Sequence, residues 1–399
     1  MIRAVAVVLA TLISAFVATA QSTPRTLVVD GALLEKRRTE FAAGKSGRSP
    51  EIAALIKAAD KILEASRTYS VTKKTQTPPS GSKNDYMSLG PYWWPDPTKP
   101  NGLPYIRRDG ERNPEIKNIP DDAEYNKMLD DAETLALAYF FTRDEKYAIQ
   151  AAAILRSWFL DPKTKMNPNL NFGQGIPGIT TGRGIGMIET RAMYRAIDAA
   201  ILLQTSRSWS ASDQAALKDW FREFLRWSIE SPLGKDESDE RNNHGTFYDV
   251  QVIAYALFTD QFDLARKQFE VTKTRIASQI EPDGSQPHEL ARTLSWGYVN
   301  MNAYGFAILA RLGESAGVDL WNYETKDGRG VRKALDWVAP FASGKKEWTH
   351  KQIKPRAFDL TVPLMEITAA KYRKPEYSAI AARLRKSGDK EGYRYLGIY

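Results

Sequence analysis

The residues best suited to acid–base chemistry gather in one stretch of the chain, residues 241–298. Its first end carries Asn243 and His244, and its second end carries Arg292 and Tyr298. Two of the three histidines in the protein fall inside this stretch. An amide and a charged imidazole can stabilise developing negative charge, while a tyrosine can move a proton. These residue types predict a site that removes a proton next to a carboxylate.

The local pattern predicts that a helix begins near Asn243, because apolar residues recur at helical spacing after it. A helix N-terminus offers unpaired backbone N–H groups and so favours a bound anion. The structural alternative is that Asn242 or Asn243 only caps this helix. At the second end, a nearby arginine would favour the phenolate of Tyr298 and lower its pKa. The alternative there is a tyrosine packed in the core and an arginine paired with some carboxylate.

Helical periodicity continues along most of the chain, and strand signals are almost absent. We expect residues 21 to about 48 to be an extended lead-in and the first helix to span residues 50–66. Further helices are expected over 121–141, from 144, over 185–203, from a cap at Ser212, and over 261–280, 298–312, 330–338, 360–370 and 377–386. Paired antiparallel helices with functional loops predict an all-α fold, an (α/α) toroid or incomplete barrel. A loose helical solenoid is the alternative.

A long segment without helical pattern, residues 71–120, separates the first two helices. It contains Tyr86, Trp93 and Trp94, and aromatic side chains need something to pack on, which argues against disorder. We expect a lid-like loop whose aromatic rings offer flat faces for stacking. The alternative for Trp93 and Trp94 is a hydrophobic plug that anchors the loop.

The N-terminus, residues 1–20, has the basic, apolar and small-residue regions of a secretory signal. We therefore expect a periplasmic or secreted protein cleaved near Ala20, without a membrane anchor, and a single domain over residues 21–399. The formal net charge of +8 suits an anionic partner. No nucleic-acid-binding motif is present, and export also argues against such a partner.

Composition also limits the chemistry. The chain has no cysteine, which excludes thiol chemistry, and its three histidines lack any metal-ligand spacing. We predict no cofactor and no catalytic metal, with a structural calcium on loop carboxylates left open.

The segment from Asn242 to Gln251 resembles the signature of the alginate-lyase superfamily of polysaccharide lyases, which includes families 5 and 38. The continuation Gly-Thr-Phe-Tyr after His244 is more similar to family 38. Four more blocks agree in order: Tyr86–Asp96, Met166–Gly178, Gly182–Thr190 and Asp283–Tyr298. The resemblance covers roughly residues 80–310 and implies an α/α toroid.

The resemblance implies β-elimination on a polyuronate. It places Asn243 and His244 at the substrate carboxylate, makes Tyr298 the proton donor and acceptor, and gives Arg292 a supporting role. His244 as the base, with Tyr298 only the acid, is the alternative. We expect substrate contacts from Gln174, Arg183, Tyr86, Trp93, Trp94, Tyr248 and His288. Glu189 is expected to orient Arg183, and His288 and Glu289 are expected to form a structural hydrogen-bonded pair.

Mannuronate-rich alginate and glucuronan are the expected substrates, and they differ only at C2, away from the elimination centre. One alternative is a glycoside hydrolase on a similar toroid, with Asp85 and Glu189 as its two carboxylates. The other is a non-catalytic protein that binds an anionic glycan. The oligomeric state is left open.

Overall fold

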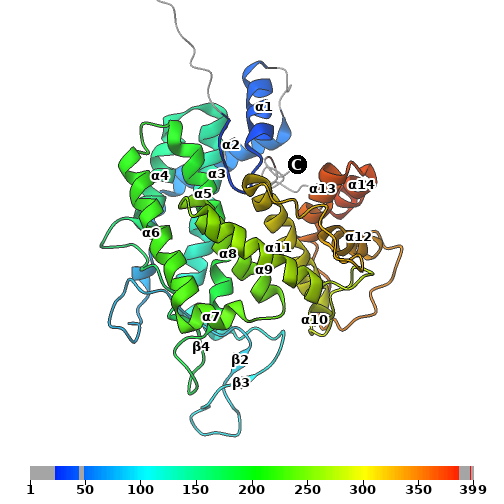
Figure 1. Cartoon of the computed structure of the whole chain (residues 1–399). Helices are drawn as coiled ribbons and strands as arrows, with labels where there is room; N and C mark the ends of the chain where they lie inside the picture. The colour runs from blue at the N-terminus through cyan, green and yellow to red at the C-terminus, as the bar shows by residue number, and fades with distance from the viewer. Residues whose placement is uncertain (1–22, 45–48, 386–395, 397–399) are drawn as a thin grey trace, which may run out of the picture.

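A computed structural model describes residues 23–44, 49–385 and 396. The predicted signal peptide, residues 1–20, lies outside them. The structure is built mainly of helices (Figure 1). The long ones are α1 (Gly31–Ala42), α2 (Pro50–Ala65), α3 (Asp121–Thr142), α4 (Glu145–Phe159), α5 (Tyr194–Leu202), α6 (Ala211–Glu230), α8 (Asn243–Phe258), α9 (Phe262–Gln279), α11 (Ser295–Ala316), α12 (Val331–Ala342), α13 (Thr361–Tyr372) and α14 (Pro375–Leu384).

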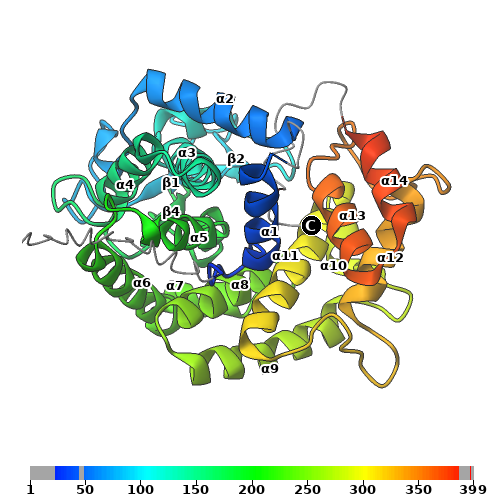
Figure 2. The same cartoon turned by 90° about the horizontal axis from the view of Figure 1, so that it is seen from above.

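The helices form two layers, and their sequences explain which layer each one joins. Every residue of α8 except His244 is buried, whereas α9 buries only one side. A helix that is apolar all round belongs inside, and an amphipathic one belongs on the surface. Figure 2 shows α3, α5, α8 and α11 within a ring formed by α2, α4, α6 and α9. The predicted α/α toroid is confirmed.

The extended lead-in predicted for residues 21–48 is wrong, because α1 lies within it. The side chain of Asp30 caps this helix by accepting a hydrogen bond from the N–H of Leu33 at 2.9 Å. Only Gly31 and Leu34 of α1 are buried, so the sequence carries little amphipathic signal. Within the described residues, no helix combines the length and the apolar character that a membrane span requires.

The segment 71–120 is folded and contributes short strands at one end of the toroid, at the bottom of Figure 1. Strand β1 (Met87–Leu89) pairs in parallel with β4 (Phe172–Gly175). Strand β2 (Trp93–Trp94) pairs antiparallel with β3 (Ile106–Arg107). Two 3-10 helices complete the segment, η1 (Val71–Lys73) and η2 (Pro114–Asn118). Backbone pairing therefore holds this segment at residues 87–89, 93–94 and 106–107.

Several predicted boundaries near the site are wrong. The single helix expected over 185–203 is split into the 3-10 helix η3 (Gly184–Thr190), α5 and the short η4 (Leu203–Thr205). Helix α6 is capped by Ser210 rather than by Ser212. Helix α7 (Pro232–Ser238) and the one-turn α10 (Pro287–Leu290) are not among the predicted helices. Proline at the first helical position starts both of these short helices.

Candidate active site

A cavity of about 520 Å³ opens at the end of the toroid that carries the strands. The loop segment 71–120 supplies one wall of this cavity, and the N-termini of α8 and α11 supply another. Acidic side chains in the lining are fewer than arginines, which suits an anionic ligand. The lining arginines are Arg107, Arg112, Arg183, Arg191 and Arg292, and the lining acids are Asp122, Glu189 and Glu240.

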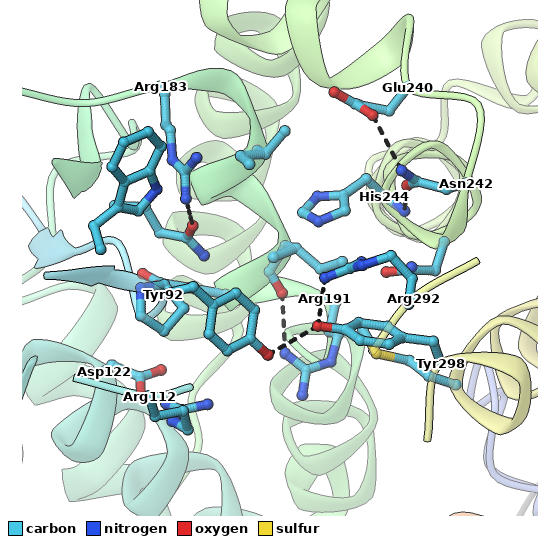
Figure 3. A pocket seen from close by; sticks show the side chains of 18 of the residues that line it. Tyr92, Arg112, Asp122, Arg183, Arg191, Glu240, Asn242, His244, Arg292 and Tyr298 are labelled. Atoms are coloured by element: carbon cyan, nitrogen blue, oxygen red, sulfur yellow. Dashed lines mark hydrogen bonds between the residues drawn. The ribbon is translucent and has the colours of Figure 1, made fainter. Parts of the chain in front are cut away.

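Tyr298 lies in the first turn of α11 with its hydroxyl in the cavity. This hydroxyl accepts a hydrogen bond from Nη2 of Arg292 at 2.8 Å and lies 2.8 Å from the hydroxyl of Tyr92 (Figure 3). Burial raises the pKa of Tyr298, and Tyr92 adds to this, so the opposing effect of Arg292 is outweighed. The predicted lowering of this pKa is wrong, and the free site holds a neutral phenol.

Arg292 is held by a carboxylate from the segment 71–120. Its Nη2 donates to Oδ1 of Asp109 at 2.8 Å, and the hydroxyl of Thr293 donates to Oδ2 at 2.8 Å. Burial opposes the charge of Asp109, but these hydrogen bonds hold the pKa of Asp109 well below its usual range. The guanidinium of Arg292 also lies 3.8 Å from the centre of the Tyr298 ring. Asp109 therefore fixes the arginine that contacts the phenol.

His244 lies in the first turn of α8 and lines the cavity. Its Nδ1 is 3.0 and 3.2 Å from the two carboxylate oxygens of Glu237, whose side chain is fully buried in α7. Burial raises the pKa of Glu237, and His244 opposes this. An ionised carboxylate only accepts hydrogen bonds, so the ionised form of Glu237 pairs with the tautomer of His244 that carries a proton on Nδ1, which leaves Nε2 for the cavity.

Asn243 precedes His244 in the same helical turn. The capping role belongs to Asn242, whose side chain accepts from the N–H of His244 at 2.9 Å. The backbone N–H and side-chain Nδ2 of Asn243 donate to the two oxygens of Glu289, at 2.6 and 2.7 Å. The predicted pair of His288 and Glu289 is therefore wrong, because Glu289 holds Asn243 and His288 is exposed.

Gln174, Arg183 and Trp93 also line the cavity. Nη2 of Arg183 donates to Oε1 of Gln174 at 2.6 Å, and its guanidinium lies 5.9 Å from the centre of the Trp93 ring. Burial lowers the pKa of Arg183 to about 10. Figure 3 shows Arg183 well separated from Arg292 and Tyr298, so the cavity has cationic groups in two places.

Four residues expected to contact substrate lie outside the cavity lining. Tyr86 is fully buried and donates to Glu189 at 2.8 Å, and the buried Tyr248 donates to the carbonyl of Ser228 at 3.2 Å. Trp94 donates its indole N–H to the carbonyl of Glu111 at 2.9 Å. His288 is exposed, as noted above. A buried aromatic ring cannot stack on a sugar, so the expected roles of Tyr86 and Tyr248 are wrong.

The two carboxylates of the hydrolase alternative do not face each other. Asp85 accepts hydrogen bonds from Asn167 and Asn169 at 2.8 and 3.0 Å and is absent from the cavity lining. Glu189 accepts from Tyr86 and from Ser88, at 2.8 and 2.6 Å, rather than pairing with Arg183 as expected. A hydrolase needs its acid and its second carboxylate on either side of the scissile bond, and this pair does not provide that.

Comparison with known proteins agrees with this site and fold. The family model for alginate lyases matches residues 70–348, so the chain belongs to the alginate lyase family. It is therefore a polysaccharide lyase, and the resemblance seen in the sequence is confirmed. No curated protein sequence gives a significant match.

Solved structures of alginate lyases share the fold. One from Bacteroides ovatus is 39% identical, with a TM-score of 0.87 over 94% of this chain and 99% of its own. Alginate lyase A1-III from Sphingomonas species A1 is 17% identical, with a TM-score of 0.57 over 95% of this chain and 99% of its own. A tetrasaccharide complex of alginate lyase A1-III is 18% identical, with a TM-score of 0.55 over 88% and 96% of the two chains.

Proposed function

We propose that the protein cleaves a β-1,4-linked polyuronate by β-elimination, with Tyr298 as the residue that moves the proton. The observation that carries this proposal is the convergence of Asn243, His244, Arg292 and Tyr298 on one cavity. Elimination requires neutralisation of the C6 carboxylate, removal of the C5 proton and protonation of the C4 oxygen. The four side chains supply a group for each requirement.

Asn243 and His244 are assigned to the C6 carboxylate. An imidazolium whose Nδ1 is paired with the buried Glu237 can donate through Nε2 to that carboxylate. Neutralising the carboxylate lowers the free energy of the C5 carbanion. The N-terminus of α8 adds its backbone dipole in the same direction.

Tyr298 is assigned to both proton transfers. In β-mannuronate and β-glucuronate the C5 hydrogen and the C4 oxygen lie on the same side of the ring, so one group can serve both steps. The neutral phenol of the free site suits donation to the C4 oxygen. For removal of the C5 proton the phenolate must form, and Arg292 and Tyr92 can both donate to its oxygen.

The raised pKa of Tyr298 favours a second assignment for the base, which is Nε2 of His244. Deuterium exchange at C5 separates the two. In Tyr298→Phe under D₂O, uncleaved substrate gains deuterium at C5 if His244 is the base. It gains none if Tyr298 is the base.

Mannuronate-rich alginate is the proposed substrate, supported by the 39% identity to an alginate lyase over nearly the whole chain. Glucuronan is the second candidate, because both polymers present the same groups at C4, C5 and C6. Ultraviolet absorbance of the new C4=C5 double bond tests the proposal on polymannuronate, polyguluronate and glucuronan, each with a chelator present. Reducing ends without absorbance would indicate a hydrolase, and binding without products would indicate a carbohydrate-binding protein.

We further infer that the protein acts in the periplasm or outside the cell, as residues 1–20 suggest. N-terminal sequencing of the mature protein tests this inference, and the expected new terminus is close to Gln21.

A further inference from the structure

The contact between Glu289 and Asn243 joins α10 to the first turn of α8. Glu289 is 1% exposed and accepts two hydrogen bonds, from the backbone N–H and from Nδ2 of Asn243, at 2.6 and 2.7 Å. Oδ1 of Asn243 is buried and has no hydrogen-bond partner within the described part of the chain. Asn243 lines the cavity and is the residue assigned to the substrate carboxylate. Its unsatisfied atom, Oδ1, is therefore part of the proposed binding site.

This arrangement of the amide is unfavourable for a uronate carboxylate. With Nδ2 used by Glu289, the amide has only an acceptor oxygen left, and an acceptor repels an anionic oxygen. A half-turn of the amide would exchange the two atoms. Nδ2 could then donate to the substrate. Oδ1 would face Glu289, and only a protonated carboxyl group at Glu289 could donate a hydrogen bond to it.

We propose that Glu289 is a positioning residue whose protonation turns the Asn243 amide so that Nδ2 donates to the substrate carboxylate. The proposal rests on the proposed function, which places Asn243 at that carboxylate. The backbone N–H of Asn243 keeps its bond to Oε1 in both states, and only Oε2 changes from acceptor to donor. The enzyme therefore takes up one proton from solvent when the anionic substrate binds.

The surroundings of Glu289 make this proton available near neutral pH. Burial raises the pKa of Glu289 to about 7, against the hydrogen bonds from Asn243 and the charges of Arg292 and His244. These two basic groups come from the segment after α10 and from α8. Tyr298 of α11, bonded to Arg292, is neutral in the free site. A second carboxylate bound at Asn243 raises the pKa of Glu289 further, since like charges favour the protonated form.

The variant Glu289→Gln tests the proposal because it imitates the protonated state. Its Oε1 can accept from the backbone N–H, and its Nε2 can donate to Oδ1 of Asn243, which holds Nδ2 toward the cavity. In the wild type, kcat/KM should fall about tenfold per pH unit above the pKa of Glu289 in the free enzyme. Glu289→Gln should lose this fall, whereas Glu289→Ala should lose activity at every pH.

Glu366→Gln is the matched control, because Glu366 is also a buried glutamate but pairs with Arg385 in the α13–α14 layer. It should keep the wild-type rate and pH profile. Parallel pH profiles for the wild type and Glu289→Gln would overturn the proposal, since a purely structural glutamate leaves the profile unchanged.

Proton uptake gives a readout that does not need turnover. Calorimetric titration of Tyr298→Phe with a mannuronate tetrasaccharide at pH 8, in buffers of different ionisation enthalpy, should show uptake on binding. Adding Glu289→Gln to the Tyr298→Phe variant should lower that uptake by up to one proton. Any proton taken up by His244 contributes equally in the single and the double variant. Equal uptake would overturn the proposal. Wild-type activity in Asn243→Ala would show that Asn243 does not touch the substrate, whereas a wild-type protein that forms no C4=C5 double bond on any of the three polymers would refute the proposed function itself.

Discussion

Replacing Asp109 with alanine should reduce turnover, although Asp109 lies behind the reacting groups. Its carboxylate accepts from Nη2 of Arg292 and from the hydroxyl of Thr293, both at 2.8 Å. The same Nη2 of Arg292 donates to the hydroxyl of Tyr298, also at 2.8 Å. Without Asp109, the guanidinium keeps its charge but loses the partner that fixes its direction.

The magnitude follows from the number and kind of bonds lost. A hydrogen bond to a charged group contributes about 1.5–3 kcal/mol, and about 1.4 kcal/mol corresponds to a factor of ten. We therefore expect kcat/KM of Asp109→Ala to fall about 10- to 100-fold. Since Arg292 supports Tyr298 most when the phenolate forms, the loss should appear mainly in kcat. Asp109→Asn keeps the shape of the side chain and should lose less.

The assay is the initial rate of double-bond formation over a range of polymannuronate concentrations. Glu111→Ala is the control, because it removes an exposed acid two residues away and should leave the rate within about twofold. Circular dichroism and thermal unfolding of both variants would report any loss of folding. A fall confined to KM, or equal effects of the two variants, would show that Asp109 does not act through Arg292.

Three further predictions concern other groups in or behind the cavity lining. Glu237→Gln should lower kcat/KM about tenfold, because a neutral partner stabilises the His244 imidazolium less; an unchanged rate would refute this. Burial raises the pKa of Glu189 from its ordinary 4.5 to about 7. The protonated form is thus favoured in the folded state, and Glu189 should contribute a fall of about 3 kcal/mol to the free energy of unfolding as pH rises from about 4.5 to about 7. Urea unfolding of Glu189→Gln should show a fall smaller by this amount, because Glu289 contributes a fall of its own in the same pH range; an identical pH dependence would contradict the reasoning. Asn242→Ala should destabilise the protein by about 1 kcal/mol through loss of the helix cap, measured in the same way.

Much of the fold could be predicted because its helices are long and carry a clear period. Helices α3 and α9 end within about two residues of the expected limits, as is usual for such patterns. Helix α1 was missed because it buries only Gly31 and Leu34. The strands were missed because each spans only two to four residues, too short for an alternating pattern to be visible.

The residues that face the cavity were easier to predict than those that hold them. Asn243, His244, Arg292 and Tyr298 are marked by chemical type and by their grouping along the chain. Tyr86 and Tyr248 were expected at the substrate for the same reason, yet an aromatic ring serves a core equally well, and both are buried. Residue type alone could not separate these two uses.

The sequence did not show which carboxylates hold the site residues in place. Arg292, His244 and Asn243 each contact a carboxylate from another element: Asp109, Glu237 and Glu289 respectively. The chain contains 48 acidic residues, and only tertiary packing shows which of them lie behind the cavity. Placing these carboxylates behind the basic and amide groups fixes the geometry without presenting negative charge to the substrate. A polyanion then meets the donors first, which is the arrangement that elimination beside a carboxylate requires.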